Sequence, residues 1–424
     1  MSTDIFLGRQ AILDGERCTF GYELLYRGGP ADVSSFDDSR QATRGVIERV
    51  LLHWGMERII GDRFGFINAD AEVIRSGIHL ALPPEGIIFE LREDEPYDDE
   101  IVEKLVEARR QGYHFALDNV RDVAHLEASQ ALPFVSMVKV ELTTVPRAEI
   151  RRLVEEVRRR VPTALLVAEK VETAADFGLC VEAGFDLFQG YFFARPEVLS
   201  KADRPTNASS AVALLAEIQR AELDVDRVEE LVGADPSLGF RLLAVVNSSA
   251  FGLDRRVDSI RHAIVLLGLN QVRHLATLLS LSASKDANEE LITLGAVRAK
   301  LASSLVSDPT LRSSAFTVGL LSVTDAIYRT PMADLLAELP VTDEISGALV
   351  DGTGELGRIL EIARACERAD VAAICEIAPD QLDAVHGHYA DAIAWADELR
   401  DHLVMRRSRV ELPGTPWAPP IVHA

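Results

Sequence analysis

The stretch Ile87-Ile88-Phe89-Glu90-Leu91 is a short apolar run with one carboxylate near its end. A run of this length, rich in β-branched and aromatic residues, is typical of a strand that is buried on both faces, as in a parallel sheet. A carboxylate at the carboxyl end of such a strand does not belong to a purely apolar core. The stretch therefore predicts a strand that presents a functional side chain.

Four more apolar runs end in a residue that can bind a cation or a phosphate. They are Phe66-Ile67-Asn68, Leu117-Asp118, Met137-Val138-Lys139 and Val167-Ala168-Glu169. Oxygen ligands and a lysine at the carboxyl ends of successive strands are expected in a (β/α) barrel, because active sites lie at that end of the fold. Such oxygens suit a hard divalent cation. The pattern predicts a metal and phosphate site at the top of a barrel.

Strand-like runs alternate with helical patterns over the first 200 residues. The expected strands are Asp4–Leu13, Thr19–Tyr26, Arg63–Asn68, Ile87–Leu91, His114–Asp118, Met137–Glu141, Leu165–Glu169 and Leu187–Phe192. The expected helices are Gln41–Ile60, Asp98–Gln111, Arg147–Arg160 and Thr173–Ala183. This alternation is typical of an α/β fold, and eight strands favour a closed (β/α)8-type barrel. A short turn, Asp14-Gly15-Glu16, connects the first two strands, so one strand of the barrel should be antiparallel.

The character of the sequence changes near the polar stretch Lys201–Asn207, which contains a proline. From Ser209 to about Leu403 the pattern is helical, and Ser259 and Gly268 are typical first and last caps of one such helix. We therefore expect a barrel domain at residues 1–203 and an all-α domain at residues 204–411. The last segment, residues 412–424, is a proline-rich tail.

Composition narrows the class of protein. The net charge of −23 disfavours binding to nucleic acid or to an anionic membrane, because both are polyanions. No apolar run approaches the roughly 20 residues of a membrane span, and the first residues lack the features of a signal peptide. The four cysteines are widely spaced, as expected for reduced thiols. These features predict a cytoplasmic protein that binds neither nucleic acid nor membrane.

Seven motifs in the first half resemble the EAL family, the barrel phosphodiesterases that linearise cyclic di-GMP. The first is Gly21-Tyr22-Glu23-Leu24-Leu25-Tyr26-Arg27, which is similar to the Glu-x-Leu-x-Arg signature. The others follow in order: Phe66-Ile67-Asn68, Glu90-Leu91-Arg92-Glu93, Ala116-Leu117-Asp118, Val138-Lys139, Ala168-Glu169-Lys170-Val171-Glu172-Thr173 and Gln189-Gly190-Tyr191-Phe192-Phe193-Ala194-Arg195-Pro196. Each motif alone is weak, but seven in order make a specific signal.

The second half resembles the HDOD domain, a helical relative of the HD phosphohydrolases. The match rests on Asp235-Pro236-Ser237-Leu238, Val246-Asn247-Ser248-Ser249 and Ala263-Ile264-Val265-Leu266-Leu267-Gly268. An EAL domain followed by an HDOD domain is an architecture of bacterial signalling proteins.

The resemblance to the EAL family implies a role for each matched residue. The metal ligands would be Glu23, Asn68, Glu90 and Asp118, holding Mg²⁺ or Mn²⁺. The catalytic residues would be Glu169, as general base, and Lys139, beside the attacked phosphate or the attacking water. The nucleotide contacts would be Arg27, Gln189 and Arg195. The loop anchors would be Glu93 and Glu172.

The chain departs from the active members of the EAL family in several places. Where they carry Asp-Asp-Phe-Gly, this chain has Asp118-Asn119-Val120-Arg121. Asn119 replaces a ligand of the second metal, so the affinity for a divalent ion should fall. The glycine-rich loop that follows is replaced, Lys139-Val140-Glu141 replaces Lys-Ile-Asp, and Lys170 in place of glycine brings a long cation near Glu169.

The helical half lacks the metal ligands of the HD hydrolases. Ser322 and Val323 occupy the positions of the adjacent His and Asp, and neither side chain offers an anionic ligand. His262 and His274 are expected on helix faces. We therefore expect no cofactor in this domain and a role in docking to a protein partner or in homodimerisation.

These observations favour a bacterial signal-transduction protein with a degenerate EAL domain. It would be catalytically inactive or weak, and it would act by binding cyclic di-GMP, by protein contacts through the HDOD domain, or by both. One alternative is an active, metal-dependent cyclic di-GMP phosphodiesterase. A second alternative is a scaffold that binds no nucleotide.

Overall fold

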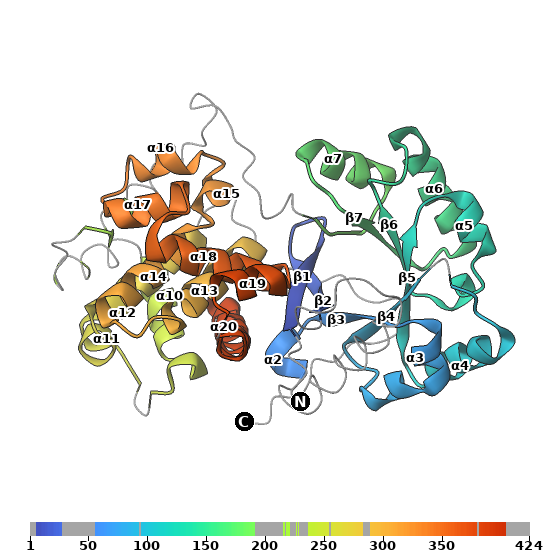
Figure 1. The fold of residues 1–424 in the computed structure, drawn as a ribbon, viewed down its shortest axis with the longest axis horizontal. Helices are drawn as coiled ribbons and strands as arrows, with labels where there is room; N and C mark the ends of the chain where they lie inside the picture. The colour runs from blue at the N-terminus through green and yellow to red at the C-terminus, as the bar shows by residue number, and fades with distance from the viewer. Residues whose placement is uncertain are drawn as a thin grey trace. The chain divides into compact units, whose positions relative to one another are not determined.

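The structure is a computed structural model. It describes residues 6–27, 56–92, 95–190, 215–216, 218–220, 226, 228, 236–253, 256–282, 289–379 and 381–403. The chain divides into two compact units, one composed mainly of residues up to Phe193 and the other mainly of residues from Ala194 to Arg407. Figure 1 shows strands and helices in the first unit and, within the described residues, helices in the second.

The first unit is built on eight strands that form a closed barrel in sequence order. They are β1 (Phe6–Asp14), β2 (Thr19–Arg27), β3 (Phe64–Asn68), β4 (Ile87–Arg92), β5 (His114–Val120), β6 (Met137–Glu141), β7 (Leu165–Glu169) and β8 (Leu187–Phe188). β1 pairs antiparallel with both β2 and β8, and the other neighbours are parallel. The Asp14 carboxylate fixes the turn after β1 by accepting hydrogen bonds from the backbone N–H groups of Glu16 and Cys18. The prediction of a barrel with one antiparallel strand is confirmed.

Helices connect the parallel strands. They are α2 (Met56–Ile60), α3 (Ala71–Ser76), α4 (Asp99–Arg110), α5 (Val123–Ala128), α6 (Arg147–Arg160) and α7 (Ala174–Ala183), with 3₁₀ turns η2 (Ile78–Ala81) and η3 (Leu132–Phe134). Side chains cap several of these helices at their first turn, for example Asp98 on α4 and Thr173 on α7. Most of the helix expected over Gln41–Ile60 lies outside the described residues, and α2 is its described end.

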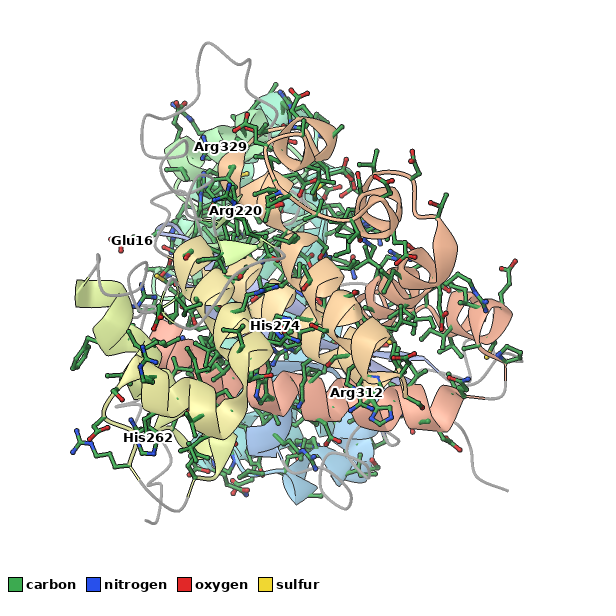
Figure 2. All side chains as sticks on the ribbon, turned by 90° about the vertical axis from the view of Figure 1, so that its left-hand side faces the viewer. Glu16, Arg220, His262, His274, Arg312 and Arg329 are labelled. Atoms are coloured by element: carbon green, nitrogen blue, oxygen red, sulfur yellow. The ribbon has the colours of Figure 1, made fainter. Side chains whose placement is uncertain are left out.

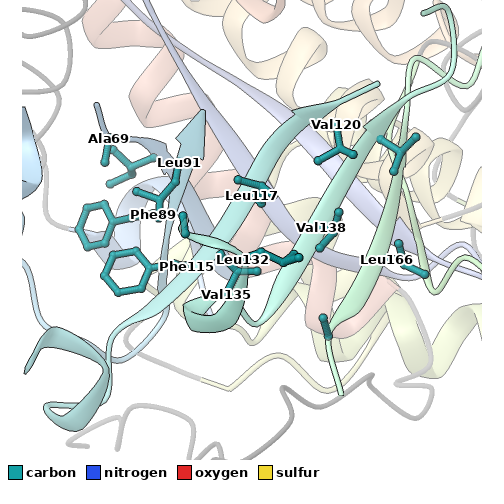
Figure 3. Close-up of a cluster of buried hydrophobic side chains, with 14 of the residues drawn as sticks. Ala69, Phe89, Leu91, Phe115, Leu117, Val120, Leu132, Val135, Val138 and Leu166 are labelled. Carbon is teal, nitrogen blue, oxygen red and sulfur yellow. The ribbon is translucent and has the colours of Figure 1, made fainter. Parts of the chain in front are cut away.

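The barrel strands bury side chains on both faces. Phe66, Ile88 and Met137 belong to a cluster inside the barrel, together with Val167 and Leu187. The alternate residues pack outward against the helices, as Figure 3 shows for Phe89, Leu91, Phe115, Leu117 and Val138 among others. This two-residue alternation is the expected geometry of a strand, and it decides which side chains reach the interior.

The second unit is helical throughout its described residues. Its helices are α10 (Pro236–Val246), α11 (Ile260–Leu267), α12 (Leu269–Ser282), α13 (Glu289–Ser304), α14 (Pro309–Leu321), α15 (Thr324–Tyr328), α16 (Met332–Leu336), α17 (Asp343–Val350), α18 (Gly354–Glu367), α19 (Val371–Ile377) and α20 (Leu382–Leu403), with the 3₁₀ turn η6 (Ser249–Phe251). α13 packs against both α14 and α20. No helix in the described part of the chain is long and apolar enough to span a membrane. All four cysteines are free thiols.

Candidate functional site in the barrel

Strand alternation brings the polar residues of the motifs to one end of the barrel interior. A residue that points inward is followed by a second inward residue two positions later. The pairs are Gly21 and Glu23, Phe66 and Asn68, Ile88 and Glu90, Ala116 and Asp118, Met137 and Lys139, and Val167 and Glu169. The barrel interior close to Glu23 is crowded, since a Cβ at Gly21 would lie 2.6 Å from the carbonyl oxygen of Phe64. The first member of each pair belongs to the barrel core and the second to the candidate site.

Lys139 lies at the centre of this group. Its side chain is 0% exposed, and its Nζ lies 2.6 Å from Oε1 of Glu90 and 2.8 Å from Oε1 of Glu169. Oε2 of Glu23 is 3.2 Å away, and Oδ1 of Asp118 is 3.6 Å away. The structure therefore brings together the catalytic pair and three of the four metal ligands that the sequence predicts.

Glu23 is held by amides as well as by Lys139. Gln189 Nε2 donates a hydrogen bond of 2.6 Å to Glu23 Oε2 and one of 3.1 Å to Gln10 Oε1, and the side chain of Asn68 also bonds to Glu23. Asn68 is itself exposed at the rim. Sequence reasoning missed Gln10 of β1, although it precedes the interior residue Ile12 by the same two-residue step.

The crowding of buried carboxyl groups changes their pKa values. Burial, assisted by the charge of Glu23, raises the pKa of Glu90 well above its ordinary value. Burial also raises the pKa of Asp118, and it raises that of Glu169 to about 8 even though Lys139 opposes the shift. In Glu23 burial is outweighed by Lys139 and the amide hydrogen bonds, so its pKa is lowered. Burial thus favours the protonated forms of Glu90, Asp118 and Glu169, whereas Lys139 and the amides favour the charged form of Glu23.

Lys139 remains a cation in this environment. Burial alone would lower its pKa, but the four surrounding carboxyl groups, led by Glu169, raise it well above its usual value. The site therefore contains a permanent internal positive charge.

Two residues at the carboxyl ends of strands adopt the left-handed backbone region. Asn119 is the last residue but one of β5, with φ of 61°, and Lys170 directly follows β7, with φ of 54°. Asn119 directs its amide nitrogen at the site, where Nδ2 donates a hydrogen bond of 2.9 Å to Asp118 Oδ2. The Nζ of Lys170 lies 2.6 Å from Oε1 of Glu141. The cation that the sequence predicts beside Glu169 is therefore paired with Glu141. Lys170 and Glu141, which both differ from the EAL pattern, thus neutralise each other's charge.

The donor set at this end of the barrel suits a divalent cation. Carboxylate and amide oxygens are what Mg²⁺ or Mn²⁺ binds, and Glu90 Oε2 is a buried acceptor without a hydrogen bond. Glu23, Glu90 and Asp118 would hold such an ion. Among the described residues, no three His, Cys, Asp or Glu side chains are grouped as a metal site, and the carboxyl oxygens of this cluster lie around Lys139.

The remaining predicted residues are more peripheral. Glu172 is exposed in the segment between β7 and α7. The side chain of Arg27 lies outside the described residues, as do Glu93 and Arg195. Their roles stay predictions.

In the helical unit, the two residues that the sequence predicts at the ligand positions of the HD hydrolases are part of a packed interior. Ser322 and Val323 are buried. The Ser322 hydroxyl donates to the carbonyl oxygen of Gly319 and accepts a hydrogen bond of 3.1 Å from Nη1 of the buried Arg298. A guanidinium beside this position would repel a metal cation.

A closed barrel with this interior cluster, in one chain with a helical unit, is the architecture of an EAL barrel joined to an HDOD domain. The EAL domain family matches residues 69–196, and the HDOD domain family matches residues 205–323. The chain therefore belongs to the EAL–HDOD proteins.

Two relatives match along nearly their whole length. The cyclic di-GMP phosphodiesterase CdgJ of Vibrio cholerae is 31% identical over 408 residues, which cover 93% of each chain. The uncharacterized protein YuxH of Bacillus subtilis is 29% identical over 411 residues, or 94% of this chain and 99% of YuxH. A solved EAL domain protein from Listeria monocytogenes is 20% identical, with a TM-score of 0.38, and the match covers 45% of this chain and 88% of that one.

Proposed function

We propose that this protein acts in cytoplasmic cyclic di-GMP signalling by binding the nucleotide at the top of its barrel, with slow hydrolysis or none. The proposal rests on the interior cluster of four carboxyl groups around Lys139 in an EAL barrel. The name of the relative CdgJ, a cyclic di-GMP phosphodiesterase, supports the class of nucleotide. The hydrogen bond from Asn119 to Asp118 supports weak turnover, because it uses a ligand oxygen that a second metal would need.

The site residues have defined chemical capacities toward a phosphodiester. Lys139 offers positive charge to a phosphate oxygen. Glu169, whose pKa lies at about 8, can hold or release a proton near neutral pH. A bound Mg²⁺ or Mn²⁺ would activate water and stabilise charge on the phosphate. Glu23, Glu90 and Asp118 are the side chains that would hold it.

The alternative function is active cyclic di-GMP hydrolysis. Two observations favour it: CdgJ is named as a cyclic di-GMP phosphodiesterase, and one cluster retains Glu23, Glu90, Asp118, Lys139 and Glu169. It differs from the first proposal in requiring a well-bound metal in spite of Asn119. If the protein neither binds nor hydrolyses cyclic di-GMP, it is a scaffold that binds no nucleotide.

Calorimetry of the full chain with cyclic di-GMP, with and without Mg²⁺ or Mn²⁺, separates these functions. We expect saturable binding in both conditions and little product by chromatography. Arg27→Ala and Arg195→Ala should each weaken binding by about tenfold if the guanidinium groups contact phosphate. Arg159→Ala removes an exposed cation from α6 and is the matched control. Absence of binding would assign the protein to the scaffolds, and turnover of about 1 s⁻¹ or more would assign it to the enzymes.

For the helical unit we propose protein contacts without metal chemistry. Phe240 and Val265 are each 76% exposed, on α10 and α11. Beside Phe240 lies a groove of about 680 Å³ that Leu243, Leu253 and Val257 also line. Exposed apolar side chains beside a groove are typical of an interaction surface.

Two measurements test the role of the helical unit. Elemental analysis of a chain with Glu90→Gln and Asp118→Asn should find no Fe, Mn or Zn, and a stoichiometric metal would contradict the proposal. Light scattering then tests for a homodimer. The unaltered chain should have the mass of a dimer, and the Phe240→Asp variant should have the mass of a monomer. An unchanged monomeric mass would assign the surface to a different protein.

A further inference from the structure

The groove beside Phe240 is lined by two parts of the helical unit, α10 and the residues that precede α11. Phe240, Leu243 and Ala244 line it from α10, and Leu253 and Val257 line it from the other side. These side chains are all apolar, and Phe240 is 76% exposed. The same surface therefore carries both an apolar side chain that projects into solvent and a hollow that such a side chain can fill.

Asn247, which directly follows α10, fixes the two sides of the groove to each other. Its Nδ2 donates a hydrogen bond of 2.8 Å to the carbonyl oxygen of Val257, and its Oδ1 accepts one of 2.7 Å from the N–H group of Val257. The same Nδ2 donates a hydrogen bond of 2.7 Å to the carbonyl oxygen of Leu243. Because one side chain bonds to the backbone of both sides, the groove keeps its shape without a bound partner.

Two residues of opposite charge lie at the groove. Arg256 and Asp258 both line it and both are exposed, whereas Val257 between them is 1% exposed. Asp258 Oδ1 lies 3.4 Å from Nδ1 of His262 on α11, which Figure 2 labels, and the Asp258 side chain is nevertheless 86% exposed. The groove thus has a cation and an anion on either side of one buried residue.

A surface of this kind is complementary to a second copy of itself. In a two-fold symmetric dimer both chains use the same patch, so that residue i contacts residue j and residue j contacts residue i. With the two-fold axis beside Val257, Arg256 of each protomer meets Asp258 of its partner, and each Phe240 can enter the partner's groove. A partner whose surface has one sign of charge would gain one attraction here and one repulsion.

We propose that the surface of Phe240, Arg256, Val257 and Asp258 joins two copies of this chain in a two-fold dimer, in which Arg256 of one protomer pairs with Asp258 of its partner. Each chain carries a net charge of −23, so two copies repel each other at long range, and the opposite charges at the contact set its register. The inference rests on the proposed protein contacts of the helical unit. It does not involve the barrel site, so loss of cyclic di-GMP binding is a separate result.

Charge reversal and mixing test this pairing in the full chain. Arg256→Glu places two acidic groups at each contact, and Asp258→Arg places two basic groups there. Each variant alone should therefore dimerise at least about tenfold more weakly than the unaltered chain, because like charges meet across the interface. An equal mixture of the two variants restores both opposite-charge pairs and should form heterodimers with close to the affinity of the unaltered dimer. Sedimentation equilibrium at physiological ionic strength, with one variant carrying a fluorescent label, measures each affinity.

The mixture separates a broken contact from a broken fold, because a variant that fails to fold cannot regain a partner by mixing. A chain with both Arg256→Glu and Asp258→Arg should likewise dimerise alone. Arg110→Glu on α4 and Glu344→Arg on α17 make the same charge changes at exposed positions of helices that do not line the groove, and these controls should remain dimeric. A monomeric unaltered chain, single variants that stay dimeric, or a mixture that stays monomeric would each overturn the inference.

Discussion

At the scale of single residues, Asn119 offers the most direct test of the proposed slow hydrolysis. Its amide donates to Asp118 Oδ2 at 2.9 Å. In Asn119→Asp an acceptor replaces the donor, so two carboxylates would face each other. We expect a lower melting temperature in a chelator, recovery in Mn²⁺, and faster hydrolysis of cyclic di-GMP, measured by calorimetry and product chromatography.

Glu169→Gln in the Asn119→Asp background is the control for this prediction. It removes the group with a pKa of about 8 and should abolish the gained hydrolysis. Equal rates for the unaltered chain and Asn119→Asp, at saturating Mn²⁺, would show that Asn119 does not limit turnover.

His274 predicts a pH dependence of stability in the helical unit. Its ring stacks on Phe316 at 4.2 Å, its Nδ1 is buried without a hydrogen-bond partner among the described residues, and Figure 2 labels it among the helices. Burial, together with the charge of Arg273, lowers its pKa to about 4. The unfolded chain, with a pKa near 6.5, takes up this proton first. Stability should therefore fall as the pH drops from 6.5 toward 4, by about 3 kcal/mol in total.

Urea unfolding of the full chain at a series of pH values measures this loss. His274→Gln should flatten the dependence of the unfolding free energy on pH across that window, because the titrating ring is gone. Identical pH profiles for the two proteins would mean that other groups account for the loss.

At the scale of elements, the close contact between α13 and α14 depends on a glycine, which has no side chain, at position 319. A Cβ at Gly319 of α14 would lie 2.4 Å from the backbone nitrogen of Ala299 in α13. Gly319→Ala must push the two helices apart and should cost about 1–3 kcal/mol, as measured by urea unfolding. Gly387→Ala in α20 meets no atom within 4 Å and should be neutral or stabilising by up to about 1 kcal/mol. Equal stabilities of the two variants would contradict this account.

The strands explain why much of the barrel could be predicted from sequence. The two-residue period assigns Ile88 and Glu90 to one face and Phe89 to the other, and the turn after Asp14 fixes the antiparallel strand. These signals are local. The same period carries Lys139 and Glu169 into the interior, so the membership of the cluster was predictable.

The backbone at the carboxyl ends of the strands explains what could not be predicted. Asn119 and Lys170 adopt positive φ values, and this conformation, which no side-chain pattern encodes, aims one at Asp118 and the other at Glu141. The stacking of His274 on Phe316 depends on tertiary packing between α12 and α14 in the same way. Sequence identified these residues but not their partners.

At the scale of the whole molecule, a net charge of −23 should slow the approach of a ligand that is itself an anion. Cyclic di-GMP carries two phosphate charges, so long-range repulsion opposes encounter until salt screens it. The association rate should therefore rise about two- to fivefold between low and physiological ionic strength, measured by stopped flow with a fluorescent analogue. A rate that falls with salt would indicate a local positive field at the barrel entrance. A low-salt buffer with sucrose, at the viscosity of the high-salt buffer, is the control for an effect of viscosity on the rate.

The burial of Lys139 also gives the barrel an intrinsic spectroscopic reporter. An ammonium group has three N–H donors, and three carboxyl groups lie within 3.2 Å of this one. Protons held in this way should exchange slowly with water, unlike those of solvated lysines, whose signals are lost to rapid exchange. In protein enriched in nitrogen-15, a spectrum tuned to ammonium groups should therefore contain a sharp resonance from Lys139, and its position would respond to changes inside the barrel without an extrinsic probe.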